Sequence, residues 1–105
     1  MVKRKINPEL KKKLGTYLAR VSKVYEIDKA FLFGSTARGE AGEFSDIDVA
    51  IVSNNITNRF LDGAKMASLT YGIDTRIEPH AIRTSEFLNK EIPIVDEILK
   101  YGVRL

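Results

Sequence analysis

Two short apolar segments, at residues 29–33 and 46–52, bracket a polar stretch rich in glycine, and this arrangement limits the folds open to the chain. Each apolar segment has the length and composition of a buried strand. The stretch between them contains Gly34, Gly39 and Gly42, so it must form turns. The sequence therefore predicts two strands separated by a turn-rich segment.

Amphipathic segments elsewhere predict helices that cover the sheet. Asn7 and Pro8 are typical of a helix start, with Asn7 as the N-cap, and apolar residues then recur at helical spacing as far as Tyr25. The remaining elements are expected as helices at 58–70 and 93–101, a helical turn at 84–87, a strand at 73–78 closed by Pro79, and a short edge strand at 103–105. The predicted fold class is α/β (α+β), a small mixed β-sheet with helices packed on it. The apolar side of the last helix is expected in the core.

The composition describes an ordinary globular chain. A length of 105 residues predicts one domain, 1–105, and 44% hydrophobic with 30% charged residues excludes a disordered chain. The absence of cysteine excludes a disulfide scaffold and a thiolate zinc site. No apolar run approaches the ~18 residues of a membrane span, and no apolar segment of a signal peptide follows the basic start. We therefore predict a cytoplasmic protein without a membrane partner.

The net charge of +3 favours polyanionic ligands, including nucleoside triphosphates. The excess gathers near the N-terminus, in Lys3, Arg4, Lys5 and residues 11–13. The usual role of such a run is a solvated helix face. A nucleic-acid patch is the alternative, but it is not favoured because no aromatic residues are interleaved there to stack bases.

Asp46 and Asp48 are the candidate metal ligands. Alternate side chains of a strand share a face, so the two carboxylates point the same way with α-carbons about 6.6 Å apart. They are able to converge on one hard cation or to bracket two, and phosphoryl-transfer sites use metals about 3.5–4 Å apart. The opposite face of this strand carries Ile47, Val49 and Ile51.

Gly34 and Ser35 are the candidate phosphate-binding residues. Glycine permits positive φ and close backbone approach, and a helical turn begun near Thr36 would aim free N–H groups at an anion. Arg38 would add a fork of donors to phosphate oxygens. Either half of this pattern is common alone, but Gly34-Ser35, ten intervening residues and Asp46-Ile47-Asp48 together form a specific combination.

The segments 34–39 and 45–49 resemble the signature of the DNA polymerase beta-type nucleotidyltransferase superfamily. The short chain is similar to the minimal nucleotidyltransferases within it, and the resemblance covers essentially the whole sequence. It implies a nucleotidyltransferase-like core with Mg²⁺ at Asp46 and Asp48, in a two-metal site, and the triphosphate of ATP at Gly34 and Ser35.

The family's site uses a third acid from a neighbouring strand, and two candidates lie in the third predicted strand. The distance from Glu78 to residues 85–87 resembles the minimal nucleotidyltransferase pattern. The local string 73–76 instead resembles the polymerase pattern, with Asp74 as ligand. Glu78 is preferred, both as metal ligand and catalytic residue, although a Glu reaches further than the family's usual Asp.

His80 is the only histidine, and it is expected as an ordinary loop residue after this strand. One histidine makes no metal cluster. Contact of His80 with a phosphate or base stays open.

The resemblance implies transfer of a nucleoside monophosphate, AMP from ATP, to an acceptor hydroxyl. The chain is short for binding an acceptor alone. Similarity to the minimal nucleotidyltransferases implies a helical HEPN partner in a toxin-antitoxin pair, with a Tyr of that partner as acceptor, or else a homo-oligomer. The alternative is a non-catalytic nucleotide-binding or partner-masking module. A drug-modifying enzyme, similar to the aminoglycoside nucleotidyltransferases, is the least favoured function. Those enzymes have additional helical parts for substrate binding that this sequence does not contain.

Overall fold

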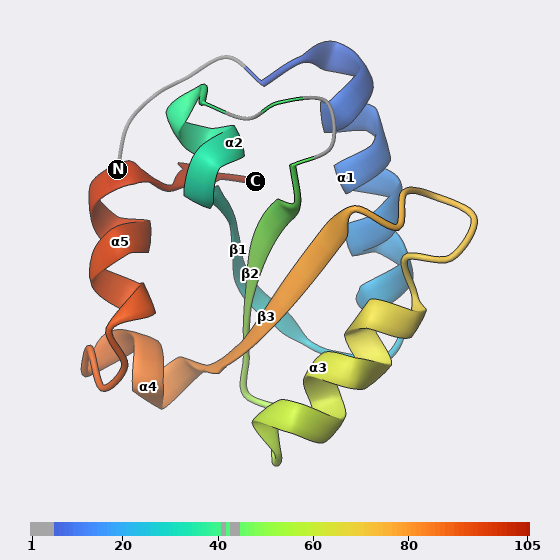
Figure 1. Ribbon diagram of the computed structural model, residues 1–105. Helices are drawn as coiled ribbons and strands as arrows, with labels where there is room; N and C mark the ends of the chain where they lie inside the picture. The colour runs from blue at the N-terminus through green and yellow to red at the C-terminus, as the bar shows by residue number, and fades with distance from the viewer. Residues whose placement is uncertain (1–5, 41, 43–44) are drawn as a thin grey trace.

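The computed structural model describes residues 6–40, 42 and 45–105, which form a four-stranded sheet with helices on both faces (Figure 1). In chain order the elements are α1 (Pro8–Val21), β1 (Ile27–Phe33), α2 (Gly34–Arg38), β2 (Ile47–Ser53), α3 (Arg59–Ser68), β3 (Ile77–Arg83), α4 (Thr84–Leu88), α5 (Ile94–Tyr101) and β4 (Val103–Arg104). The predicted fold class is confirmed. The basic residues Lys3, Arg4 and Lys5 lie outside the described residues.

The strand order in the sheet is β3-β2-β1-β4. β1 runs antiparallel to both β2 and β4, whereas β2 and β3 are parallel and joined through α3. Phe33 at the end of β1 is in register with Asp48, and Asp48 is in register with Glu78 of β3. The end of β1 and the starts of β2 and β3 therefore meet at one end of the sheet, where α2 follows β1 (Figure 1).

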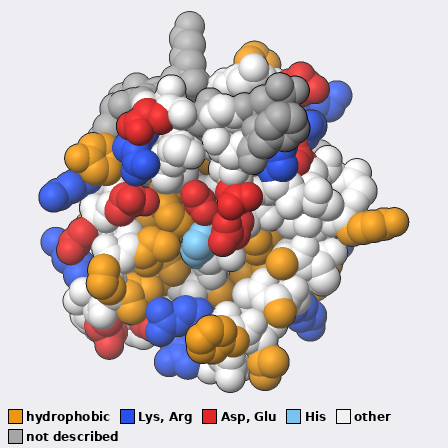
Figure 2. Space-filling view, in the orientation of Figure 1, with side chains coloured by type: hydrophobic (Ala, Val, Ile, Leu, Met, Phe, Trp, Pro, Cys, Tyr) orange, Lys and Arg blue, Asp and Glu red, His pale blue; other side chains and the backbone are white. Residues whose placement is uncertain are grey.

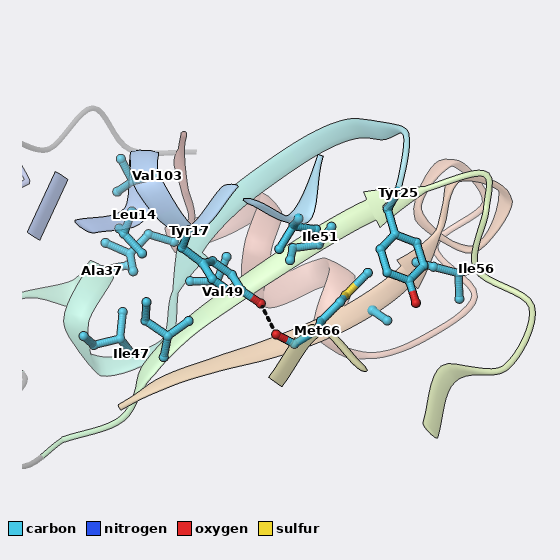
Figure 3. Close-up of a cluster of buried hydrophobic side chains, with 14 residues drawn as sticks. Leu14, Tyr17, Tyr25, Ala37, Ile47, Val49, Ile51, Ile56, Met66 and Val103 are labelled. Carbon is cyan, nitrogen blue, oxygen red and sulfur yellow. Dashed lines mark hydrogen bonds between the residues drawn. The ribbon is translucent and has the colours of Figure 1, made fainter. Parts of the chain in front are cut away.

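The two faces of β2 pack against different helices. Ile47, Val49 and Ile51 are buried with residues of α1 and α3, among them Tyr17, whose hydroxyl donates a 2.8 Å hydrogen bond to the carbonyl of Met66 (Figure 3). The other face has a second cluster, shared with α4 and α5, composed of Phe31, Phe33, Ala50, Val52, Ile82, Phe87, Val95 and Ile98. The predicted alternation in β2 and the predicted core role of the last helix are confirmed.

Helix α1 begins where the sequence predicts. The Asn7 side chain accepts hydrogen bonds from the amides of Glu9 (2.9 Å) and Leu10 (3.4 Å), and Pro8 occupies the first helical position. The helix ends at Val21 rather than near Tyr25. The residues after Val21 turn, which buries Tyr25 and brings its hydroxyl within 2.6 Å of Asp62 in α3.

The predicted bounds of the third strand were wrong. Residues 73–76 form turns, closed by hydrogen bonds to the carbonyls of Thr70 and Asp74. The strand runs from Ile77 through Pro79 to Arg83. Proline lacks a donor and is tolerated in a strand whose one edge has no partner. Because β3 is such an edge strand, Pro79 sits opposite Val49 without ending the ladder.

None of the helices within residues 6–40, 42 and 45–105 has both the length and the hydropathy that a membrane span requires.

Candidate active site

Three carboxylates meet at the end of the sheet where β2 and β3 begin. Asp48 of β2 and Glu78 of β3 are direct partners in the parallel register, and Asp46 immediately precedes β2. In Figure 2 acidic side chains gather around the histidine near the middle of this face. The Asp46 carboxyl group is hydrogen-bonded to that of Glu78, and the pairing of the two strands sets Glu78 beside Asp48.

The electrostatics of Glu78 reflect this crowding. Partial desolvation, a hydrogen bond with the Asp46 carboxyl group and the charge of Asp48 raise the pKa of Glu78, while His80 opposes the shift. Within the described part of the chain, no lysine or arginine forms an ion pair with Asp46 or Glu78. These acids repel one another and lack a cationic partner among those residues.

His80 lies in β3 beside this cluster, so its expected position in a loop was wrong. It follows Glu78 by two residues and shares its face of the strand. Its Nε2 atom is 3.1 Å from Oδ1 of Asp48, and its ring packs edge-on against Phe33 with centroids 4.9 Å apart. The alternation of a strand continued past Pro79 is the signal that would have placed it here.

These side chains fit a divalent cation. Asp48, Glu78 and His80 each offer one ligand atom, and these atoms lie within 4.8 Å of one another. Carboxylate oxygens suit hard cations such as Mg²⁺, and imidazole nitrogen suits transition metals. A cation would also relieve the repulsion that acts on Glu78.

Gly34 supplies the tight turn from β1 into α2. Its φ is +72°, and a β-carbon there would collide with Oδ2 of Asp48. Helix α2 begins at Gly34 and includes Ser35, earlier than the expected start near Thr36. The Thr36 hydroxyl donates a 3.2 Å hydrogen bond to the carbonyl of Asp46, which ties α2 to the start of β2.

Arg38 at the end of α2 contacts two acidic side chains. Its Nε lies 3.2 Å from Glu40, and its Nη1 lies 3.4 Å from Glu97 of α5. The structure therefore places Arg38 next to the Gly34-Ser35 turn but already engaged in ion pairs.

Asp74 lies in the turn before β3, in a separate set of ion pairs. Its side chain is 7% exposed and lies 2.7 Å from Nη2 of Arg76 and 3.2 Å from Nζ of Lys13. Hydrogen bonds from Arg76 are the main cause that holds the pKa of Asp74 well below its usual range. The structure joins Glu78, and not Asp74, to Asp46 and Asp48.

A cleft of about 560 Å³ opens along the edge strand β3, and Glu78 and His80 are among its lining residues. Its apolar wall comes from β3 and the segment before α5, with the start of α3 opposite. The lining residues include Glu78, His80, Ile82, Arg59, Phe60 and Ile94. No local pattern in the sequence predicts this cleft, because it forms where segments distant in the chain come together.

One comparison with known proteins shows the family of the chain. A model described as nucleotidyltransferase domain matches residues 4–105, nearly the whole chain. No curated protein matches the sequence.

Solved structures share the fold at low sequence identity. A protein from Sulfolobus solfataricus assigned as a nucleotidyltransferase is 23% identical with a TM-score of 0.64, over 99% of this chain and 89% of that one. A toxin-antitoxin structure with AMP-PNP is 19% identical with a TM-score of 0.57, over 93% and 72% of the two chains. A mutant of the toxin-antitoxin MntA-HpeT is 20% identical with a TM-score of 0.54, over 90% and 70%.

The matched residues include the Gly34-Ser35 turn, Asp46, Asp48 and Glu78. The chain belongs to the nucleotidyltransferase domain family and is an enzyme of the nucleotidyltransferase class.

Proposed function

We propose that this nucleotidyltransferase moves AMP from ATP to an acceptor hydroxyl, with Mg²⁺ held by Asp46, Asp48 and Glu78. The observation that carries the proposal is the register of β2 and β3, which sets Glu78 directly opposite Asp48 beside Asp46. The absence of a described basic partner for Asp46 and Glu78 supports a cation in this place.

Mg²⁺ bound here would neutralise charge that develops on the phosphates during transfer. Asp46, Asp48 and Glu78 would hold one or two such ions. The amides of the Gly34-Ser35 turn and the Ser35 hydroxyl would bind the outer phosphates, because the first N–H groups of a helix lack partners within it. The Arg38 guanidinium has five N–H donors and would reach them by exchanging one of its ion pairs.

The transfer itself joins the acceptor oxygen to the α-phosphorus. The bond from that phosphorus to the bridging oxygen breaks, and pyrophosphate leaves. Glu78 would take the proton of the acceptor hydroxyl, since its carboxylate lies at the rim of the cleft and beside Asp48.

The cleft beyond Glu78 and His80 is the proposed acceptor site. It lies along β3, whereas Gly34 lies against Asp48 of β2, so an acceptor in the cleft would approach the α-phosphate from the β3 side and the pyrophosphate would leave toward the Gly34-Ser35 turn. Its apolar wall and the exposed Phe60 favour an acceptor carried by an apolar surface.

A helical HEPN protein in a toxin-antitoxin pair is the proposed partner, with a Tyr as the acceptor. The toxin-antitoxin proteins that share this fold support the choice. Gel filtration of the chain alone and with the product of a neighbouring gene distinguishes this partner from a homo-oligomer.

Calorimetric titration with ATP, with and without Mg²⁺, tests the site. Binding should require Mg²⁺ and should disappear in the Asp46→Asn, Asp48→Asn double variant while the fold is kept. Asp74→Asn is the control, since it makes the same kind of substitution at a carboxylate outside the cluster. Failure of the folded wild-type chain to bind ATP would favour a site completed by the partner or an inactive, partner-masking module.

A further inference from the structure

The His80 side chain reaches the surface of the site and directs a ring nitrogen at the carboxylates. It is 30% exposed, and the side chain of Asp48 is 24% exposed, so both reach the surface of the site. Phe33 holds the imidazole edge-on and directs Nε2 toward the cluster. A hydrogen bond between His80 and Asp48 needs no further ligand atom nearby, yet an oxygen of Glu78 and a ring nitrogen of His80 lie within 4.8 Å of each other.

We propose that His80 is a ligand of the divalent cation and that the site therefore prefers Mn²⁺ to Mg²⁺. The inference rests on the proposed function and deepens it. Ligation through Nε2 requires the neutral ring with its proton on Nδ1. In that tautomer Nε2 presents a lone pair toward Oδ1 of Asp48, 3.1 Å away, in a group whose ligand atoms, one of them from Glu78, lie within 4.8 Å of one another.

The preference follows from the chemistry of the donors. Mg²⁺ favours oxygen ligands and retains water, whereas first-row transition ions gain affinity from imidazole. Mn²⁺ accepts both carboxylate oxygen and imidazole nitrogen, which is the set assembled by Asp48, Glu78 and His80. Asp46 would complete the set with oxygen, because its carboxyl group contacts that of Glu78.

Because His80 is the only histidine of the chain, the test is unambiguous. Protein without a polyhistidine tag is loaded with Mn²⁺ alone, and pulsed electron paramagnetic resonance measures the coupling of the ion to the ligating ¹⁴N of an imidazole. The wild-type protein should give this coupling. The His80→Ala variant should lose it, and added free imidazole should restore it.

Titration of both ions gives a second, independent measure. His80→Ala should reduce Mn²⁺ affinity about tenfold or more, while Mg²⁺ affinity should change less than about threefold. Asp74→Asn should leave both affinities unchanged. Circular dichroism establishes that each variant is folded.

The outcomes separate the two proposals. Divalent binding that depends on Asp48 and Glu78 but shows no nitrogen coupling, with the same Mn²⁺ to Mg²⁺ ratio in His80→Ala, would overturn the role of His80 alone. In that case His80 only positions Asp48. Absence of any Mn²⁺ or Mg²⁺ binding by the folded wild-type protein would overturn both this inference and the proposed function.

Discussion

The carboxylate of Asp48 occupies the space that a β-carbon on Gly34 would need. One of its oxygens, Oδ2, lies against Gly34, and the other, Oδ1, lies 3.1 Å from Nε2 of His80. The side chain of Asp48 is thus held between the turn that begins α2 and the edge strand β3. The proposed phosphate-binding turn and metal ligand are therefore directly coupled.

Gly34→Ala should weaken both the fold and the site. An L-residue at φ +72° is strained, and the new methyl group would displace Asp48, so we expect a loss of about 1–3 kcal/mol in the free energy of unfolding. Urea unfolding measures the loss, and Mg²⁺-dependent ATP binding should fall with it.

Gly15→Ala is the matched control for that substitution. Gly15 lies inside α1, and a β-carbon there would meet nothing within 4 Å. The change should stabilise the chain by about 0.5–1 kcal/mol, since alanine favours helix interiors. Equal destabilisation by both variants would contradict the role given to the contact between Gly34 and Asp48.

Glu78→Gln and Asp74→Asn should separate binding from stability. The Glu78 variant should keep its unfolding free energy within about 0.5 kcal/mol and lose metal-dependent ATP binding. The free energy of unfolding of the Asp74 variant should fall by about 1–3 kcal/mol. The reason is that the amide cannot replace the nearly buried carboxylate, which accepts charged hydrogen bonds from Lys13 and Arg76. Calorimetry measures ATP binding and urea unfolding measures stability for both variants. Loss of ATP binding in Asp74→Asn together with retained binding in Glu78→Gln would make Asp74 the third ligand.

The ion pairs of Asp74 should make the stability of the folded chain sensitive to acid. The pKa of Asp74 is lowered in the folded chain, so the unfolded chain takes up the proton first as pH falls. The stability that Asp74 contributes is therefore complete well above the unfolded pKa of about 3.9 and is lost as pH falls below it. Thermal unfolding between pH 7 and pH 3 should show a steeper decline for wild type than for Asp74→Asn. Parallel curves would contradict this assignment.

Phe60→Ala should impair the acceptor step while ATP binding persists. Phe60 is 89% exposed at the cleft, so its removal should change stability by less than about 0.5 kcal/mol. If the cleft receives the acceptor, kcat/KM for transfer should fall about tenfold, which corresponds to the loss of a buried aromatic contact. Tyr71→Ala removes a similarly exposed ring (82%) that does not line this cleft, and it should leave kcat/KM unchanged.

The sequence by itself determined the local elements and one half of the site. Asn7 and Pro8 set the start of α1 through hydrogen bonds within a few residues. The alternation in β2 separated Asp48 from Ile47 and Val49 because the period of a strand is a local property. The Gly34-Ser35 turn likewise follows from the conformational freedom of one residue.

The tertiary structure alone decided the other half of the site. Proline commonly ends a strand, and only the edge position of β3 allowed it to continue through Pro79. That continuation set Glu78 opposite Asp48 and brought His80 into the cluster, whereas Asp74 remained in a turn with Lys13. Which strands pair, and in which register, depends on contacts between segments far apart in the chain, and no local pattern encodes those contacts.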